Sequence, residues 1–483
     1  MNPKSAFTTL PIYLLFFTTC TNGFSIYNAL FKAQSNLKSL IYQNHPIPEG
    51  YTYCQAEYPI ADNYKKVPNS ELLHVQLFLR HGDRTPENLI KNELVDWNDC
   101  KQSYDHIQLR PNNSEQTDIT FQLIPQLPAK SSTNTDSKKD FSSKLWTGSC
   151  SVGQLTDLGK QQHIQLGKAI RELYVEKLNF LDSELSSANI ERNINVRTSQ
   201  IWRTQNTAES FLNGLYPSIN RKNQTNIPMN YYPIQIETML SNTIMCPKIK
   251  LILQKIALSR DYINYLKSTR KEMAKLNHIF GVNTNADSKW LYSWISHMDV
   301  LQPRLCNNKP YPCNLDLCAS KQDAKFALNN ANFETKYIKR DSIYSDMLTR
   351  LTAGPLLNEI LVGFNKVIGN KDKNNQIPKL SIFSAHDETL TNLLGAFKAN
   401  DEGILWPPYA SNLAIELWKQ NPSNGQSASH SIRILYNGKT LQVLGTKNET
   451  NKPWCDFNSC DYSNFEKYLT TIIPDDIIKE CEI

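Results

Sequence analysis

The feature that most constrains the fold is a nearly continuous apolar run at Leu72–Leu79 (LLHVQLFL), bounded by charged residues. Such a run is typical of a strand that is buried on both faces of a parallel sheet. A second short apolar run, Leu380–Phe383, has the same character. Strand patterns alternate with helical patterns along the chain, which favours an α/β core.

Several local patterns predict elements of this core and of a second lobe. Thr156 can cap a helix that continues to about Leu181, and Lys248–Phe280 has one long helical pattern. Asn437-Gly438, between two apolar segments, predicts a type I′ hairpin turn, because both central positions of that turn need positive φ. The stretch 218–344 lacks strong strand patterns, so we expect it to form an inserted α-helical cap.

Composition and charge argue against a nucleic-acid-binding protein. The 483 residues carry a formal charge of +6, from 52 basic and 46 acidic side chains. That excess permits an acidic substrate, but the chain has no dense basic tract with interleaved aromatic residues, so we expect no nucleic-acid partner. No pattern in the sequence indicates an oligomeric state.

The beginning of the chain predicts entry into the secretory pathway. An apolar stretch, Ala6–Phe17, follows a short basic start and precedes a polar stretch that ends near Gly23. We expect residues 1–24 to form a signal peptide, with an uncleaved membrane anchor as the alternative, and residues 25–50 to form a stem. Sequons at Asn112, Asn223 and Asn448 fit this compartment.

Cysteine usage points to the same compartment. Of the 11 cysteines, Cys20 lies in the targeting segment and the other ten form an even set, as expected for a disulfide-bonded lumenal protein. Their pairing cannot be deduced from the sequence. Zinc binding is the alternative for the clusters 306–318 and 455–460, but their spacing lacks the usual CxxC pattern. We expect no metal and no cofactor.

The most informative motif, RHGDRTP at 80–86, follows the first predicted strand directly. Open α/β sheets bind ligands at the carboxyl ends of their strands. Arg80 and Arg84 offer donors that match phosphate oxygens, and a neutral His81 between them could attack phosphorus. The alternative is a solvated basic turn with a hydrogen-bonded histidine.

Two further strand ends carry matching residues. His386 and Asp387 follow the strand at 380–383 and could supply a phosphate donor and a proton donor, although capping and packing would explain them equally well. Arg197 ends a predicted strand at 194–196 and completes a set of three strand ends. We expect Arg203, further along, to be a structural or rim residue.

Together these segments resemble the histidine acid phosphatase family, a branch of the phosphoglycerate mutase-like superfamily. The resemblance rests on RHGDRTP at 80–86, VRTSQIWRT at 196–204, SAHDETL at 384–390 and the helix pattern at 153–174. It implies a three-layer α/β sandwich with a mostly parallel central sheet, formed by 51–217 and 345–483, and an α-helical cap domain at 218–344.

The resemblance also implies roles for individual residues. His81 would be the nucleophile that forms a phosphohistidine, and Asp387 the general acid. The phosphate ligands would be Arg80, Arg84, Arg197 and His386. The arginines should lower the pKa of His81, and they would supply the electrostatic stabilisation that a metal ion supplies elsewhere.

Within the family, CNNKPYPCNLDLC at 306–318 and HSIRILYNG at 430–438 are similar to the 2-phosphoxylose phosphatase branch. That likeness implies a Golgi enzyme that removes phosphate from xylose 2-phosphate in the glycosaminoglycan linkage region of proteoglycans. A broad lysosomal or secreted acid phosphatase is the alternative. An inactive protein that only binds phosphorylated ligands is the alternative outside the enzymes, but the complete set of motif residues disfavours it.

Overall fold

The computed structural model describes residues 51–91, 93–100, 146, 148–222, 226–285, 289–315, 317–370, 377–421, 429–445 and 452–483. By its contacts the chain divides into Met1–Glu49 and Gly50–Ile483, and the described residues all belong to the second unit. The expected targeting segment at 1–24, the stem at 25–50 and the sequons at Asn112, Asn223 and Asn448 lie outside the described residues. Among the described helices, none has the length and apolar character needed to cross a membrane.

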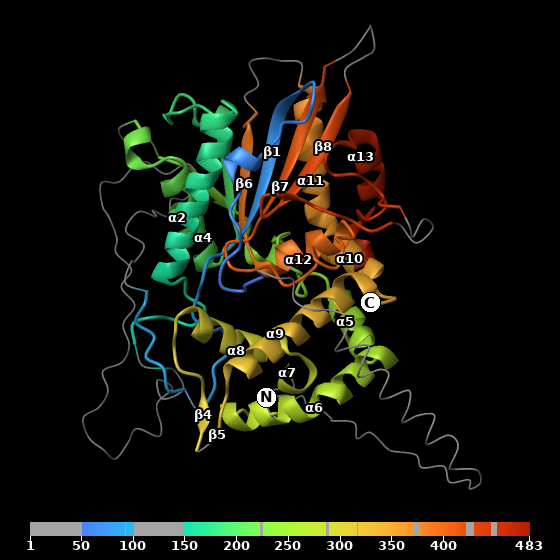
Figure 1. The fold of residues 1–483 in the computed structure, drawn as a ribbon. Helices are drawn as coiled ribbons and strands as arrows, with labels where there is room; N and C mark the ends of the chain where they lie inside the picture. The colour runs from blue at the N-terminus through green and yellow to red at the C-terminus, as the bar shows by residue number, and fades with distance from the viewer. Residues whose placement is uncertain are drawn as a thin grey trace, which may run out of the picture. The chain divides into compact units, whose positions relative to one another are not determined.

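A mixed eight-stranded sheet forms the centre of this unit, with strand order β10-β8-β7-β1-β6-β2-β3 and β9 paired to β8 (Figure 1). Strands β1, β6, β2 and β3 run parallel, whereas β7, β8, β9 and β10 extend the sheet with antiparallel pairings. The strands are β1 (Ser70–Arg80), β2 (Ile194–Thr198), β3 (Met229–Tyr231), β6 (Leu380–Ala385), β7 (Asn412–Gln420), β8 (His430–Tyr436), β9 (Lys439–Thr440) and β10 (Cys460–Asp461).

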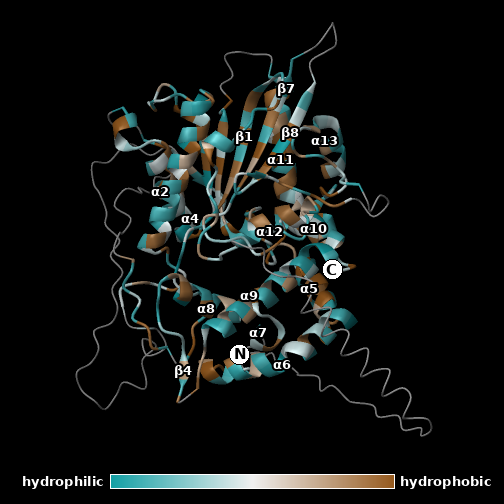
Figure 2. Ribbon diagram, viewed as in Figure 1, coloured by the Kyte–Doolittle hydropathy of each residue, from teal (hydrophilic) through white to brown (hydrophobic). Residues whose placement is uncertain are grey.

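Helices cover both faces of the sheet, which confirms the expected α/β sandwich. Because side chains alternate along a strand, β1 sends Phe78 into the core under α11–α13, and Leu77 and Leu79 into the core under α2 and α4. Figure 2 shows the apolar residues concentrated along the strands and on the helix faces that meet them. The helices of the α/β body are α2 (Asp157–Arg171), α3 (Ile190–Asn193), α4 (Trp202–Leu215), α10 (Ser345–Thr352), α11 (Gly354–Gly369), α12 (Asp387–Ala396), α13 (Tyr462–Thr470) and α14 (Ile477–Glu480).

The expected helical lobe lies at the end of the sheet where the parallel strands terminate (Figure 1). The predicted helix over 248–280 is two helices, because Ser259 starts a new one by accepting from the backbone N–H of Tyr262. Strand β3 falls inside the range 218–344, yet it pairs with β2 in the central sheet. The lobe contains α5 (Lys248–Ala257), α6 (Arg260–Phe280), α7 (Lys289–Tyr292), α8 (Ile295–Cys306), α9 (Lys321–Lys336) and the small hairpin β4–β5 (Cys313–Asn314, Leu317–Cys318).

Short segments connect these elements. The predicted hairpin turn forms as expected, with positive φ at both Asn437 (48°) and Gly438 (78°). The remaining short helical turns are η1 (Ala61–Asn63), η3 (Glu172–Lys177), η4 (Ser218–Asn220), η5 (Ile234–Ile236) and η6 (Tyr337–Asp341).

Ten cysteines form five disulfides, so the cysteine clusters at 306–318 and 455–460 are not zinc ligands. The pairs are Cys54–Cys306, Cys100–Cys150, Cys246–Cys481, Cys313–Cys318 and Cys455–Cys460. Cys54–Cys306 joins the segment before β1 to the end of α8 and therefore ties the helical lobe to the sheet.

Candidate active site

The two histidine motifs converge at the carboxyl ends of β1 and β6. These strands are parallel neighbours, with Arg80 opposite Ala385 in the register. The backbone N–H of His81 donates to the carbonyl oxygen of Ala385 (3.2 Å), and the rings of His81 and His386 have centroids 5.9 Å apart. The sheet therefore holds both imidazoles in one place.

One ring nitrogen of His81 is hydrogen-bonded, and the other has no partner among the described residues. Its Nδ1 lies 2.8 Å from the carbonyl oxygen of Gly82, and since a carbonyl can only accept, Nδ1 carries the proton. Nε2 is buried and has no hydrogen-bond partner among the described residues. Burial lowers the pKa of His81 well below its usual value, and the charges of Arg203, Arg80 and Arg84 lower it further. The structure thus presents a neutral imidazole with a free lone pair on Nε2.

Arg80 is fully buried and held from several sides. It donates to the hydroxyl of Tyr53 (2.9 Å) and to the carbonyl of Pro407, and its guanidinium lies against the rings of Tyr53 and Tyr409, 5.0 Å and 4.4 Å from their centroids. Its Nη2 also lies 2.9 Å from Oδ2 of Asp387. These contacts restrict the guanidinium to one orientation beside the histidines.

Arg84 is positioned by a carboxylate from the helical lobe. Its Nη1 donates to Oδ1 of Asp299 on α8 (2.7 Å), and both side chains are nearly inaccessible to solvent. Oδ2 of Asp299 accepts from the backbone N–H groups of Glu87 and Asn88 and from the Asn88 side chain (2.7–2.9 Å). Asp299 therefore fixes both Arg84 and the segment that follows it.

His386 and Asp387 lie at the beginning of α12. Nε2 of His386 is 2.8 Å from the hydroxyl of Ser199, which follows β2, and Asp387 accepts from the backbone N–H of Glu388 (2.8 Å). Burial raises the pKa of Asp387, but Arg80, Arg84, His386 and Arg203 outweigh it and hold that pKa below the usual value. Asp387 is thus a carboxylate that nearby positively charged side chains stabilise.

The structure does not bring Arg197 into this group. Arg197 makes ion pairs with Glu237 (2.5 Å) and Glu359, donates to Thr238 (2.9 Å) and lies over the ring of Tyr232. The reason is strand alternation: at its position on β2 the side chain points to the sheet face covered by α11, which carries Glu359. The sequence-based assignment of Arg197 as a phosphate ligand is not supported by this geometry.

Arg203, rather than Arg197, lies beside the histidines. It lies in the first turn of α4, its Nη2 is 3.5 Å from Nδ1 of His386, and its Nη1 pairs with Glu87 (2.8 Å). Arg203 is also the charge with the largest effect on the pKa of both His81 and His386. The structure therefore places Arg203 beside the histidines, although the sequence analysis expected it to be only a structural or rim residue. Both arginines belong to the motif at 196–204, but Arg203 lies beside the histidines and Arg197 does not.

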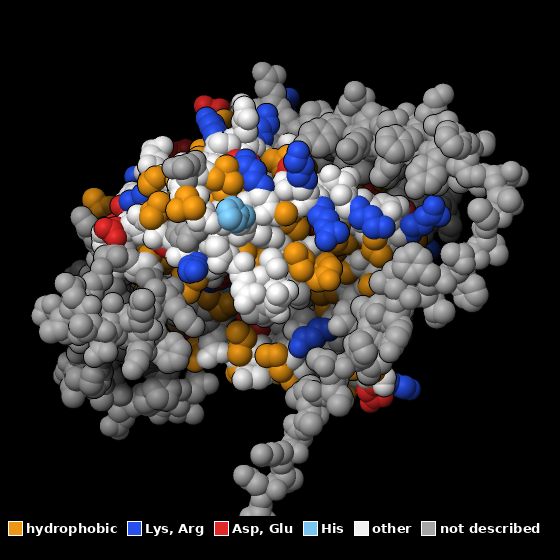
Figure 3. Space-filling view, turned by 90° about the horizontal axis from the view of Figure 1, so that it is seen from below, with side chains coloured by type: hydrophobic (Ala, Val, Ile, Leu, Met, Phe, Trp, Pro, Cys, Tyr) orange, Lys and Arg blue, Asp and Glu red, His pale blue; other side chains and the backbone are white. Residues whose placement is uncertain are grey.

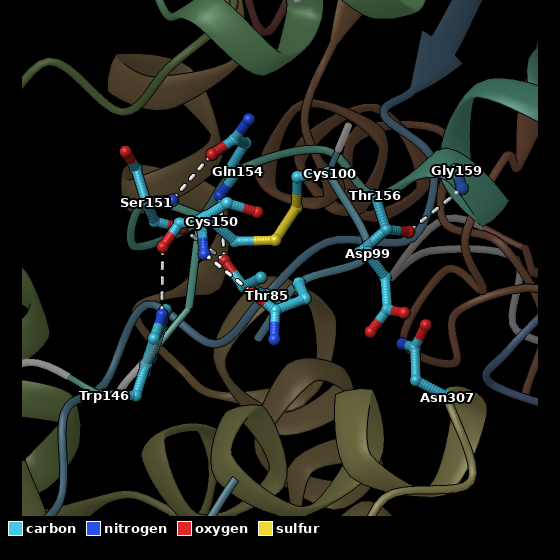
Figure 4. The surroundings of a disulfide bond; sticks show 12 residues. Thr85, Asp99, Cys100, Trp146, Cys150, Ser151, Gln154, Thr156, Gly159 and Asn307 are labelled. Carbon is cyan, nitrogen blue, oxygen red and sulfur yellow. Dashed lines mark hydrogen bonds between the residues drawn. A yellow bond between two sulfur atoms is a disulfide. The ribbon is translucent and has the colours of Figure 1, made fainter. Parts of the chain in front are cut away.

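A second layer of contacts supports the loop that carries Arg84. Thr85 donates its backbone N–H to the carbonyl of Gln154 (2.9 Å) and its hydroxyl to that of Ser151 (2.7 Å). The disulfide Cys100–Cys150 holds the beginning of this 150–156 segment, and Trp146 donates to the carbonyl of Cys150 (2.9 Å) (Figure 4).

Asp83, the central acidic residue of the motif, contacts α2 and the end of α8. It accepts from the hydroxyl of Thr156 (2.5 Å) and from the side chain of Asn307 (2.8 Å), and burial raises its pKa to about 6. Thr156 caps α2, as expected, by accepting from Gly159. Asp83 therefore joins the 80–86 segment to α2 and to the end of α8.

Two other buried histidines, His163 and His74, have contacts with backbone carbonyls. Nε2 of His163 lies 3.0 Å from the carbonyl of Arg80, and Nδ1 of His74 lies 2.7 Å from that of Pro378. Among the described residues, no cluster of three or more histidine, cysteine or acidic side chains could hold a metal ion.

Comparison with known proteins identifies the family. The model of the histidine phosphatase superfamily (branch 2) matches residues 71–437. The chain belongs to this superfamily. Two relatives of this histidine phosphatase are counting factor 60 from Dictyostelium discoideum (26% identity, covering 87% of this chain and 91% of that protein) and 2-phosphoxylose phosphatase 1 from Homo sapiens (25%, 81% and 76%).

A solved structure agrees with the fold. The apo form of Hafnia alvei phytase has a TM-score of 0.53 and 14% identity, and the match covers 87% of this chain and all of that one. The family and its phosphatase members show that the chain is a phosphatase of the histidine acid phosphatase type.

Proposed function

We propose that this phosphatase hydrolyses phosphate monoesters through a phosphohistidine at His81, and that Arg80, Arg84, Arg203 and His386 bind the phosphoryl group. The observation that carries the proposal is the free, buried Nε2 of a neutral His81 beside these cations. Guanidinium groups stabilise the charge that accumulates on the phosphoryl oxygens in the transition state.

In the first step, Nε2 of His81 attacks phosphorus and the bond from phosphorus to the ester oxygen breaks. Asp387, in its protonated form, donates its proton to the leaving alkoxide, which is a poor leaving group without it. In the second step, the Asp387 carboxylate accepts a proton from water as the water attacks phosphorus. The phosphorus–nitrogen bond then breaks, inorganic phosphate leaves, and His81 and Asp387 return to their initial states.

Rapid-quench labelling, with the reaction stopped in alkali, tests this mechanism. A substrate with labelled phosphate should give an acid-labile, alkali-stable phosphoenzyme in the wild type, and none in His81→Ala. We expect His81→Ala to lose on the order of 10⁴-fold or more of kcat. Hydrolysis that persists in this variant would contradict the mechanism, whatever the natural substrate is.

For the substrate, we propose xylose 2-phosphate in the glycosaminoglycan linkage region, and for the location the Golgi lumen. Support comes from the similarity to 2-phosphoxylose phosphatase 1 along most of both chains, and from five disulfides, which fit the secretory pathway. Phosphate release from a linkage-region oligosaccharide carrying xylose 2-phosphate should be compared with release from an aryl phosphate. A higher kcat/KM for the oligosaccharide supports the proposal, and equal values favour a broad acid phosphatase.

A further inference from the structure

Helix α6 in the helical lobe has an exposed face that is unusually basic. The helix contains five Lys and Arg residues and two acidic residues. With 3.6 residues per turn, Arg260, Lys267, Lys271 and His278 fall within about 20° of one line along the helix. Figure 3 views the lobe from below and shows Lys and Arg side chains in a row with one exposed histidine. We call the exposed side chains of Arg260, Lys267, Arg270, Lys271, Lys275 and His278 the α6 row.

The α6 row lies opposite the buried face of the helix. Tyr262, Tyr265, Met273 and Leu276 pack into the lobe, so the apolar side of α6 is already occupied. The row extends about 27 Å along the helix, at a rise of about 1.5 Å per residue. A band of positive charge of this length matches an extended ligand better than a single anion.

Three charges of the row have no acidic partner among the residues that the structure describes. Lys275 pairs with Asp323 (2.8 Å), but no described carboxylate lies within salt-bridge distance of Lys267, Arg270 or Lys271. Lys267, Lys271 and Lys275 are spaced four residues apart, and like charges at this spacing destabilise a helix by roughly 0.2–0.5 kcal/mol per pair. An ordinary solvated helix face places acidic residues at these positions, so the repulsion indicates that the row serves binding.

We propose that the α6 row is a docking surface for a linear anionic polysaccharide. A membrane surface fits less well, because an interfacial helix inserts an apolar face, and none of the exposed large hydrophobic residues among those described lies on α6. The disulfides place the chain in an oxidising compartment, where carboxylated and sulfated polysaccharides are the extended polyanions. The inference goes beyond the proposed hydrolysis and does not depend on it, because α8 and α9 lie between α6 and the sheet (Figure 1).

Binding of the full chain to heparin, as the sulfated polysaccharide probe, tests the proposal. We compare the wild type with the triple variant Lys267→Gln, Arg270→Gln and Lys271→Gln. The matched control removes three exposed charges from the α/β body: Lys65→Gln, Lys66→Gln and Lys168→Gln. Activity on an aryl phosphate, unchanged in both variants, shows that they are folded.

The expected result is that the wild type binds at low salt and that added salt weakens its binding. The α6 variant should bind about tenfold more weakly, and the control should equal the wild type. Equal losses in both variants would show an effect of net charge alone and would overturn the proposal. So would the absence of wild-type binding, or binding to phosphatidylserine vesicles without binding to heparin.

Discussion

Asp299 and Arg84 form an ion pair (2.7 Å) that reaches from helix α8 of the helical lobe to the catalytic loop. Both side chains are nearly inaccessible to solvent, and the same carboxylate accepts from the backbone of Glu87 and Asn88. The helical lobe therefore does more than cover the site, since it supplies the group that orients a proposed phosphate ligand.

We predict that Asp299→Asn lowers the free energy of unfolding by about 3 kcal/mol, because it removes the buried carboxylate that pairs with Arg84 and leaves only the exposed Glu87, 3.4 Å away. It should also lower kcat/KM for an aryl phosphate at least tenfold. Inorganic phosphate should raise the melting temperature of the variant more than that of the wild type, since a bound anion replaces the missing charge. Asp346→Asn, which breaks a surface pair with Lys398, is the control and should change neither quantity appreciably. An equal phosphate effect on all three proteins would argue against this role.

The lowered pKa values of His81 and Asp387 predict that the enzyme is more active at acidic pH than at neutral pH. The pKa of His81 lies well below its usual value, so the nucleophile stays unprotonated in mild acid. The pKa of Asp387 is also lowered, so the protonated form that donates to the leaving group becomes scarce as the pH rises. The rate should therefore decline with rising pH.

The variant Asp387→Asn separates the contribution of Asp387 to this pH dependence from that of His81. It should lower kcat for an alkyl phosphate by about 10²–10⁴-fold and affect an aryl phosphate less, because an aryl leaving group needs less protonation. The measurement is the pH profile of kcat on both substrates. If the decline at high pH persists unchanged in the variant, Asp387 is not the group that causes it.

Arg203 and Arg197 form a natural matched pair for testing the phosphate ligands. Arg203→Gln should weaken inhibition by inorganic phosphate about ten- to hundredfold, as expected for a lost charge-assisted hydrogen bond. Arg197→Gln should leave phosphate inhibition near the wild-type value and destabilise the fold instead, because Glu237 is buried in the pair. Inhibition constants and unfolding curves distinguish the two, and the reverse pattern would restore Arg197 as the ligand.

The sequence predicted the strands at 72–79, 194–196 and 380–383, the Asn437-Gly438 turn and the convergence of the histidine motifs. The strands and the turn depend on local patterns, and the convergence follows from the rule that ligands bind at the carboxyl ends of strands. It misplaced Arg197, since the direction of a side chain depends on the register of β2 against β6, which no local pattern shows. Asp299 and Tyr409 were missed because both are far in sequence from the arginines they hold. Only the packing of the helical lobe and of the segment before β7 brings them to the site.

The disulfide Cys100–Cys150 should support catalysis as well as stability. It closes the base of the 101–149 segment next to the stretch whose backbone holds Thr85 (Figure 4). Replacing both cysteines by serine should lower the free energy of unfolding by about 4 kcal/mol for a closed loop of this length. It should also lower kcat several-fold, because the loop carrying Arg84 loses its support.

The control for that prediction is the double serine variant of Cys313–Cys318, which lies in the β4–β5 hairpin of the helical lobe. Its short loop should give a loss of about 2 kcal/mol, and kcat should stay at the wild-type value. Chemical denaturation and steady-state kinetics measure both quantities. If the two variants lose kcat equally, the effect reflects general loosening of the fold, and the proposed support of the catalytic loop by Cys100–Cys150 is wrong.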